Sequence, residues 1–216
     1  LALFDLDNTL IAGDSDHLWG DFLVNQGLVD PQTHKALNEL FYRQYQEGQL
    51  DIDEYLSFAL GPMAGMTPES LSALHRIFVK EHIEPILLDR AFDLIQEHRI
   101  KGDTIVIITA TNTLVTRPIA DRLGVEHLIG CEAEIENGYF TGKPSGIPSF
   151  AEGKVIRIKS WCEAQGQSME GAVFYSDSHN DLPLLQAVDK PVAVDPDERL
   201  KSEALRNGWD IISLRD

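Results

Sequence analysis

Residues 1–16 read LALFDLDNTLIAGDSD, a short apolar run that ends in two aspartates one residue apart. The apolar residues 1–4 are typical of a strand that is buried on both faces of a sheet. Side chains two apart on a strand point to the same side, so Asp5 and Asp7 converge on one small volume. Two carboxylates held that close repel each other unless one is protonated or a cation lies between them. The alternative is that the pair caps a turn at the start of a solvated loop.

The rest of the chain predicts an α/β fold. Further strands are indicated by apolar runs at residues 104–109, 172–175, 192–194 and 211–213. Helical periodicity lies between them at residues 85–98, 113–123 and 148–164. Strands that alternate with helices predict a three-layer, Rossmann-like core with a parallel sheet covered on both faces. Asn137-Gly138, between two short extended runs, predicts a β-hairpin across residues 131–143.

A long helical insertion separates the first two predicted strands. About ninety residues there show helical spacing of apolar side chains, whereas a simple crossover needs only about a dozen residues and a helix. We therefore expect residues 15–81 to form an all-helical inserted domain, and residues 1–14 with 82–216 to form the core. The insertion starts just after Asp7, at the carboxyl edge of the sheet, where α/β proteins bind ligands.

Composition excludes several classes of function. The chain has 18 Lys and Arg against 35 Asp and Glu, a net charge of −17, which disfavours a nucleic-acid partner because phosphate backbones require basic patches. No run approaches the roughly 18 apolar residues of a membrane span, so no membrane partner is expected. Cys131 and Cys162 form neither a metal-spaced pair nor a disulfide framework, which favours a cytoplasmic location. The chain shows no secretory signal and opens inside an apparent strand without Met, so we expect a few residues to precede Leu1.

Polar residues close each predicted strand. The second strand ends in TATN (109–112) before a helix, and a hydroxyl beside the free N–H groups of a helix start suits an anion. The third strand ends in SDSHND (176–181), which adds two carboxylates, and Lys154 lies early in a predicted helix. Carboxylates from two strand ends form a hard oxygen site suited to Mg²⁺. A metal that bridges carboxylate and phosphate, with a carboxylate free to attack, predicts phosphoryl transfer through an aspartyl phosphate.

DLDNTL, the strand end IITAT, a downstream lysine and SDSHND resemble, in this order, the four motifs of the haloacid dehalogenase (HAD) phosphatases. The resemblance covers essentially the whole chain, and the helical insertion resembles the C1 cap of the phosphoserine-phosphatase-like branch. The fourth motif has Ser where the family more often has Gly, a departure that bears on loop geometry and leaves the carboxylates in place.

The resemblance implies a catalytic role for each motif. Asp5 is expected to be the nucleophile that takes the phosphoryl group. Asp7 is expected to protonate the leaving alkoxide and then to activate water as a base. Thr109 and Ala110 are expected to bind the phosphate, and Lys154 to neutralise charge between Asp5 and that phosphate.

The resemblance also implies a Mg²⁺ site. The expected ligands are Asp5, the backbone carbonyl of Asp7, and Asp177. Asp181 is expected to hold the water shell of the metal or to orient Lys154.

Each motif residue also has a plain structural interpretation. Thr109 suits a helix N-cap, Asp177 a turn, and Lys154 a solvated charge. Four motifs in the family's order favour the catalytic interpretation. Lys143 is a rival for the lysine role, but its place in the predicted hairpin indicates a solvated charge.

The substrate is a small phosphorylated metabolite on this interpretation. Asp14 lies where phosphoserine phosphatases have an acidic residue that binds the substrate's ammonium group, and it is equally suited to cap the helix that follows. Those phosphatases also have a cap arginine that pairs with the substrate carboxylate, whereas DEYLSFAL (53–60) has no Arg or Lys. An amino-alcohol phosphate without a carboxylate fits better, because a buried carboxylate without its partner binds poorly. Histidinol phosphate is the leading candidate.

Other functions remain open: a phosphoserine phosphatase, a phosphotransferase or mutase on the same scaffold, and a phospho-ligand sensor without turnover. Several cap residues either line the pocket or, as their helical spacing favours, pack in the cap core: His17, Trp19, Phe22, Tyr42 and Tyr45. His179 is expected in a loop near the mouth of the site.

Overall fold

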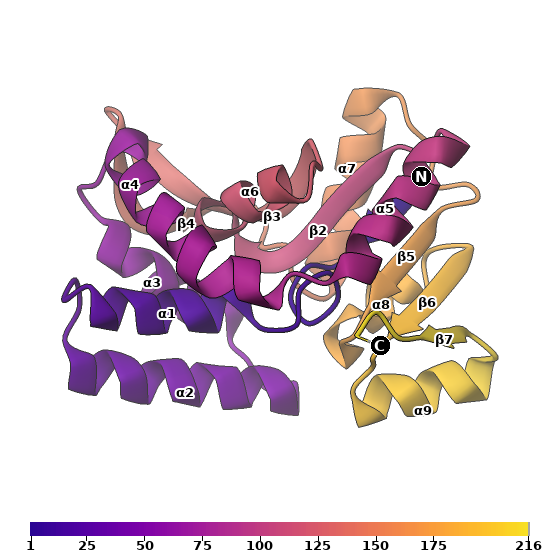
Figure 1. Cartoon of the computed structure of the whole chain (residues 1–216), viewed down its shortest axis with the longest axis horizontal. Helices are drawn as coiled ribbons and strands as arrows, with labels where there is room; N and C mark the ends of the chain where they lie inside the picture. Colours follow the sequence, from indigo (N-terminus) through magenta and orange to yellow (C-terminus); the bar gives the residue numbers. More distant parts are fainter. Residues whose placement is uncertain (216) are drawn as a thin grey trace.

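Parallel strands form most of the sheet, and one antiparallel strand lies at its edge (Figure 1). The computed structural model describes residues 1–215. The strand order is β4-β3-β2-β1-β5-β6-β7, and only the β3–β4 pair is antiparallel. The strands are β1 (Ala2–Phe4), β2 (Ile105–Asn112), β3 (His127–Glu136), β4 (Tyr139–Ser145), β5 (Val173–Ser176), β6 (Lys190–Val194) and β7 (Asp210–Ile212).

Helices lie in the connections between the strands, except between β3 and β4, which a tight turn joins. They are α1 (Ser15–Asn25), α2 (Pro31–Glu47), α3 (Ile52–Leu60), α4 (Pro68–Phe78), α5 (Asp89–Lys101), α6 (Thr113–Arg122), α7 (Glu152–Gln165), α8 (Leu182–Leu185) and α9 (Glu198–Asn207). Within residues 1–215, no helix combines the length and apolar character that crossing a membrane requires.

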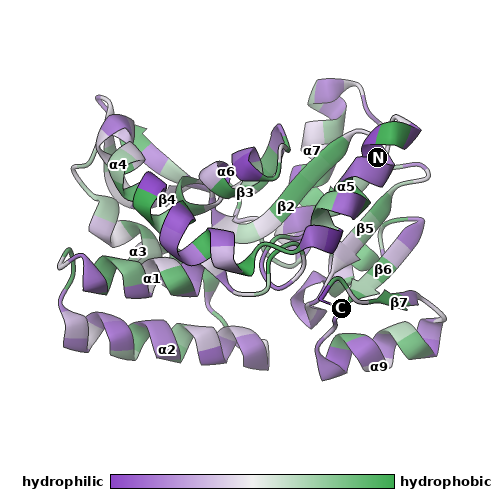
Figure 2. Cartoon of the chain, viewed as in Figure 1, coloured by the Kyte–Doolittle hydropathy of each residue, from purple (hydrophilic) through white to green (hydrophobic). Residues whose placement is uncertain are grey.

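The sheet is buried on both faces, as its apolar strands predict. Phe4 and Ile107 point to the face packed with α5 and α6, whereas Leu3, Val106 and Phe174 point to the face packed with α7, α8 and α9. Successive residues of one strand thus belong to two different cores. Figure 2 shows the apolar central strands between helices whose outer surfaces are polar. The predicted three-layer α/β fold is confirmed.

Helices α1 to α4 lie between β1 and β2 in the chain and stand to one side of the sheet in Figure 1. Each begins at a side-chain cap that accepts backbone N–H groups: Asp14, Asp30, Asp51 and Thr67. Their core contains an aromatic cluster in which the rings of Trp19, Phe22 and Phe78 lie within 5.0–5.6 Å of one another. The division of the chain into a core and an inserted cap at residues 15 and 81 stays a prediction.

Several element boundaries differ from the predicted ones for local reasons. Helix α5 starts at Asp89 and not at residue 85, because Leu87 is extended and pairs with Ile11. Helix α7 starts at Glu152 and not at 148, because Ala151 has a φ of 46°. Helix α9, in which half of the residues are charged, is not among the helices that the sequence predicts.

The β-hairpin is longer than predicted and supports the inserted helices. Its turn is at Asn137-Gly138, as predicted, where both residues have positive φ. The first half of β3 pairs in parallel with β2, so one strand serves both the main sheet and the hairpin. Phe140 exchanges backbone hydrogen bonds with Gly65 (2.8 Å) and Met66 (2.9 Å), which fixes the helical insertion against β4.

Replacement of Gly20 by alanine tests how α1 packs on α2. A Cβ atom at Gly20 would lie 2.6 Å from Nδ2 of Asn38, a buried side chain that donates to the carbonyl of His17 at 3.0 Å. We expect Gly20→Ala to lower the free energy of unfolding by about 1–3 kcal/mol, because overpacking displaces that amide. Urea denaturation measures the change. Gly61→Ala is the matched control, since a Cβ there meets nothing within 4 Å; an equal loss in both variants would contradict the interpretation.

Candidate active site

The carboxyl ends of three adjacent strands bring the motif residues together. Asp5 follows β1, Thr109 lies near the end of β2, and Asp177 follows β5. Lys154 reaches the same point from the first turn of α7. Asp5, Thr109 and Lys154 are buried and Asp177 is partly exposed, so residues more than 170 positions apart in the sequence share one site.

Lys154 is the cation at the centre of this site. Its Nζ atom donates to Oδ1 of Asp5 at 2.8 Å and to Oδ2 of Asp181 at 2.8 Å, and its side chain is 2% exposed. Ser176 donates to the same oxygen of Asp181 at 2.7 Å. The two carboxylates raise the pKa of Lys154 above its ordinary value despite burial. Lysine is therefore held charged, and Asp181 orients it.

Burial acts on the pKa of Asp5 in the opposite direction to its effect on the pKa of Lys154, because in each case it disfavours the charged form. Burial raises the pKa of Asp5 to about 7, while the Lys154 ammonium acts against the rise and the charge of Asp181 adds to it. The pKa of Asp177 is raised well above its ordinary value by burial and by the charges of Asp5 and Asp181. A single ammonium thus leaves negative charge uncompensated at this edge of the sheet.

The oxygen atoms of Asp5 and Asp177 are suited to a divalent cation. Thr9 links them, since its hydroxyl donates to Oδ1 of Asp177 at 3.2 Å and lies 3.5 Å from Oδ2 of Asp5. Asp177 forms no ion pair with a side chain of residues 1–215. Burial and the negative charges of Asp5 and Asp181 favour its protonated form. In the described part of the chain, no three His, Cys, Asp or Glu side chains form a ready metal cluster. A metal here would therefore take two carboxylates and complete its shell with backbone or water oxygens.

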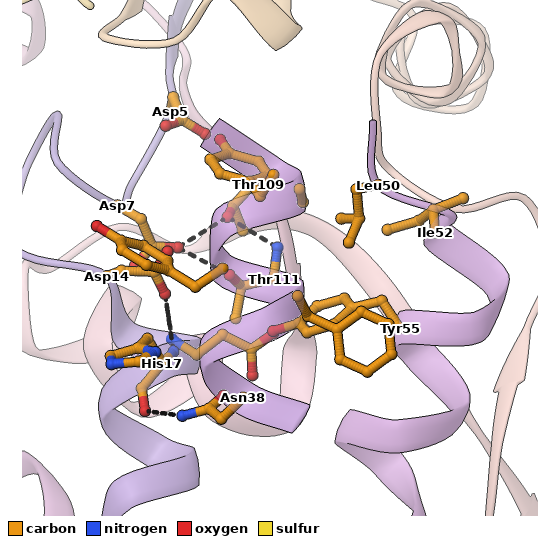
Figure 3. A pocket seen from close by; sticks show the side chains of 15 residues that line it. Asp5, Asp7, Asp14, His17, Asn38, Leu50, Ile52, Tyr55, Thr109 and Thr111 are labelled. Atoms are coloured by element: carbon orange, nitrogen blue, oxygen red, sulfur yellow. Dashed lines mark hydrogen bonds between the residues drawn. The ribbon is translucent and has the colours of Figure 1, made fainter. Parts of the chain in front are cut away.

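Asp7 faces away from Asp177 and toward β2. Its Oδ1 accepts from the N–H of Ser15 at 2.6 Å. Its Oδ2 accepts from the hydroxyl of Thr111 at 2.8 Å (Figure 3). The hydroxyl of Thr109 lies 3.5 Å from the same Oδ2. Burial and the charge of Asp14 raise the pKa of Asp7 to about 6. A carboxyl with a pKa close to neutral can both donate and accept a proton at physiological pH.

A pocket opens beside these residues, between the strand ends and the helical insertion. It is lined by Asp5, Asp7, Asp14, Asp16, His17, Asn38, Phe41, Tyr42, Tyr45, Leu50, Ile52, Tyr55, Thr109, Ala110 and Thr111. Figure 3 shows Asp7 and Asp14 on one side of the pocket and Leu50, Ile52 and Tyr55 on the other. No Lys or Arg belongs to this lining, so its four aspartates have no cationic side chain beside them in the pocket wall.

The structure bears on two interpretations that the sequence leaves open, those of Asp14 and of Lys143. Asp14 is the N-cap of α1, because its Oδ1 accepts from the N–H groups of Asp16 (3.0 Å) and His17 (2.8 Å), and it also lines the pocket. Cap formation and ligand contact are thus compatible. Lys143 is exposed on β4, as predicted.

The predicted cap residues divide into two groups. His17, Tyr42 and Tyr45 line the pocket, whereas Trp19 and Phe22 are buried in the core. The sequence leaves both places open for these five residues and favours the core. Three of them line the pocket instead, because the N-terminal part of α1 and the C-terminal half of α2 face the sheet edge.

The end of α2 contacts the loop that carries Asp177. Tyr45 donates to the hydroxyl of Ser178 at 3.3 Å, and its carbonyl accepts from the Asn180 amide at 3.1 Å. His179 lies in a short 3-10 helix (His179–Asp181) and pairs with Asp197 at 2.7 Å; its place near the mouth of the site stays a prediction. These contacts hold the helical insertion over the strand ends.

The site contains several residues that the sequence did not predict. Thr9 stands inside the first motif and was assigned no role, although its spacing from Asp5 was the available signal. Thr111 follows Thr109 by two positions, so its side chain reaches the same side of the strand. No local pattern marks Asp16 or Tyr55, which meet at the pocket from α1 and α3.

Comparison with known proteins identifies the class of the chain. A family model described as haloacid dehalogenase-like hydrolase matches residues 2–186. The chain therefore belongs to the haloacid dehalogenase-like hydrolase family, as its four motifs predict. Within that family it is a phosphatase, a hydrolase of phosphoric monoesters.

Its relatives carry two specific names. A histidinol-phosphatase of Neisseria meningitidis serogroup C is 43% identical over 219 residues, which span 100% of this chain and 99% of that protein. A phosphoserine phosphatase of Mycobacterium tuberculosis is 32% identical, across 99% of this chain and 70% of that protein. A solved structure of a protein of unknown function from Bordetella pertussis has a TM-score of 0.93 at 41% identity, covering 99% and 98% of the two chains. A substrate-bound phosphoserine phosphatase shares the fold, with a TM-score of 0.69 at 17% identity and coverage of 99% and 92%.

The pH dependence of stability tests the electrostatics of the pocket. Burial, with the charges of Asp14 and Asp7, raises the pKa of Asp16 to about 7. The folded chain therefore holds a proton there that the unfolded chain releases from about pH 4 upward, so stability falls as pH rises between about 4 and 7. We expect Asp16→Asn to leave the free energy of unfolding nearly unchanged at pH 4 and to raise it by up to about 4 kcal/mol at pH 8.

Urea denaturation at both pH values measures this difference. Asp53→Asn is the control, because Asp53 is exposed on α3 and outside the pocket, and it should change little at either pH. A gain in Asp16→Asn that is equal at pH 4 and pH 8 would contradict the assigned pKa.

Proposed function

We propose that this phosphatase hydrolyses a small amino-alcohol phosphate, with histidinol phosphate as the leading candidate, through a phosphorylated Asp5 and with Mg²⁺ as cofactor. The observation that carries the proposal is the pairing of a buried Asp5–Lys154 site with an acidic pocket that no Lys or Arg lines. The Asp5–Lys154 pair supports the phosphoryl-transfer chemistry, and the acidic pocket supports the class of substrate.

Asp5 is the proposed nucleophile because its orientation is fixed and one of its oxygens is free for attack. Lys154 binds Oδ1 at 2.8 Å, while Oδ2 has only the long 3.5 Å contact from Thr9. Attack of Oδ2 on phosphorus forms the aspartyl phosphate and releases the alkoxide of the substrate. The Lys154 ammonium offsets the negative charge of the transferring group, and a preorganised charge of this kind is worth several kcal/mol of barrier.

Asp7 is the proposed general acid and base. Its two hydrogen bonds, from Ser15 and Thr111, fix the orientation of the carboxyl at the pocket that Asp5 also lines. A pKa raised to about 6 allows it to carry the proton that the leaving alkoxide takes. The resulting carboxylate then accepts a proton from the water that attacks the phosphorus of the intermediate, so the proton count returns to its starting value.

Mg²⁺ fits the oxygen donors that the geometry leaves available. Asp5, Asp177 and the backbone carbonyl of Asp7 would hold it, and when bound it supplies positive charge to the phosphate oxygens. The hard, all-oxygen donor set favours Mg²⁺ over metals that prefer imidazole or thiolate. Asp181, bound to Lys154, sets the position of the ammonium, and Thr109 with Ala110 is left to bind the phosphate.

The pocket beyond the phosphate favours a cationic substrate. Asp14 and Asp16 face it, and the stretch 53–60 that carries Tyr55 has no Arg or Lys to pair with a substrate carboxylate. Phosphoserine would bring its carboxylate toward two others without a partner, which costs binding energy. The similarity to the histidinol-phosphatase of Neisseria meningitidis, along the full length of both chains, supports the same choice.

Replacement of Asp5 tests the chemistry. We expect Asp5→Asn to lower kcat for phosphate release by at least about 10³-fold, because removal of a nucleophile abolishes the covalent path. EDTA should stop release by the native chain, and added MgCl₂ should restore it. Release of free phosphate from an aryl phosphate and from histidinol phosphate measures both effects.

Asp93→Asn is the matched control, since Asp93 is exposed on α5, away from the site, and its activity should equal that of the native chain. Retention of turnover in Asp5→Asn would rule out the aspartyl phosphate. Release of alcohol without an equal amount of phosphate would favour a phosphotransferase.

A panel of esters tests the substrate class. We expect kcat/KM for histidinol phosphate to exceed that for phosphoserine by at least about tenfold, a difference of about 1.4 kcal/mol, because only phosphoserine places a carboxylate among the acidic side chains. Phosphoethanolamine and a sugar phosphate complete the panel. Faster turnover of phosphoserine would overturn the substrate assignment and leave the phosphatase chemistry in place.

A further inference from the structure

Asp16 is a buried carboxylate that the fold does not use. It lies in the first turn of α1 and is 6% exposed. Its Oδ1 receives one long hydrogen bond, from Nδ2 of Asn112 at 3.4 Å. Its Oδ2 has no hydrogen-bond partner among residues 1–215. An unpartnered buried carboxylate oxygen is costly, so its retention at this position requires a reason.

Local helix chemistry does not supply that reason. The N-cap of α1 is Asp14, which already accepts the N–H groups of Asp16 and His17. A negative charge in the first turn favours a helix, but an exposed carboxylate would do so without the cost of burial. The Tyr55 hydroxyl lies near enough to lower the pKa of Asp16, yet it leaves Oδ2 without a hydrogen bond.

The position of Asp16 in the pocket points to a ligand. Asp14 and Asp16 both line the pocket that holds Asp5 and Asp7, and no Lys or Arg among its lining residues offers them charge. Two carboxylates in one pocket can satisfy two separate donor groups on a single ligand. One of those groups is the amine expected beside Asp14.

The walls around Asp16 indicate the chemistry of the second group. Phe41 and Tyr55 lie at the same end of the pocket, with ring centroids 5.4 Å apart at 64°. Figure 3 shows Tyr55 entering from the wall opposite Asp7 and Asp14. Aromatic side chains stack on or meet the edge of a flat ring at such distances. A flat ring with an N–H group would place its faces against these aromatics and its N–H toward a carboxylate.

We propose that Asp16 is a specificity-determining residue that accepts a hydrogen bond from the ring N–H of a heteroaromatic substrate, while Asp14 binds the amine. The ligand class is therefore a phosphate ester that carries both an amine and an azole ring. This inference rests on the proposed function, because it assigns the ring of a histidinol-phosphate-like ester to Asp16. It also explains why the chain keeps an acidic residue where burial is costly.

Two amine esters and two variants test the assignment. Histidinol phosphate carries the ring, and 2-aminopropyl phosphate keeps the amine and the ester but has a methyl in place of the ring-bearing arm. Asp16→Asn retains a neutral acceptor of the same shape, and Asp16→Leu removes the acceptor. We expect kcat/KM for histidinol phosphate to fall in the order native, Asn, Leu, by about tenfold or more in Leu, mainly through KM. The 2-aminopropyl ester should lose much less than histidinol phosphate in either variant, because its amine loses only the more distant charge of Asp16 and no direct hydrogen bond.

Asp53→Asn is the control for loss of one negative charge from the same helical insertion, and it should behave as the native chain with both esters. Thermal denaturation of each variant shows whether it is folded. An equal loss with both esters would assign Asp16 a structural role, and an unchanged kcat/KM for histidinol phosphate would also overturn the proposal.

Calorimetric titration with the product alcohols separates this inference from the proposed function. Histidinol should bind the native chain more tightly than 2-aminopropanol, and the difference should disappear in Asp16→Leu. That result without turnover of histidinol phosphate would support the role of Asp16 and refute the substrate assignment. Equal affinities of the native chain for the two alcohols would overturn the role of Asp16 whatever the turnover.

Discussion

The ammonium of Lys154 is the charge that allows carboxylates from two separate strand ends to be buried together. It lies 2.8 Å from Asp5 and 2.7 Å from Asp181. A buried ammonium with two carboxylates is tolerable only when every donor and acceptor is paired, and loss of one partner leaves an uncompensated charge. The position of α7 on the sheet, the conformation of the loop after β5 and the orientation of Asp5, the proposed nucleophile, therefore depend on one another.

One cation is nevertheless too few for the acidic groups around it. Burial and mutual repulsion raise the pKa values of Asp5, Asp7 and Asp177, so the site favours additional positive charge. A divalent ion at the Asp5–Asp177 end and a cationic substrate at the Asp14–Asp16 end both supply it. The same excess of negative charge would account both for the proposed metal requirement and for the proposed preference for a cationic ester.

The helical insertion determines which ligands reach this charge. Its α1 carries the acidic wall and its α2 and α3 carry the aromatic one. Contacts from Tyr45 and Glu47 to Ser178 and Arg199 hold the end of α2 on the loop beside Asp177. A substrate enclosed there is shielded from bulk water, which strengthens each electrostatic contact in the site. The proposed phosphoryl transfer therefore takes place at the strand ends, and the helices of the insertion form the part of the pocket that would select the substrate.

The sequence by itself determined the layer architecture, the hairpin turn and the motif residues, because these depend on local signals: apolar periodicity, Asn137-Gly138, and acidic residues that directly follow buried strands. It could not place the start of α7, which depends on the positive φ of Ala151, or the double pairing of β3. It also could not bring Asp16 and Tyr55 to one pocket, since they are separated in the chain and no spacing rule links two helices of an insertion. Only the tertiary structure decided which of many acidic and aromatic residues line the pocket, because that depends on how α1, α2 and α3 pack over the edge of the sheet.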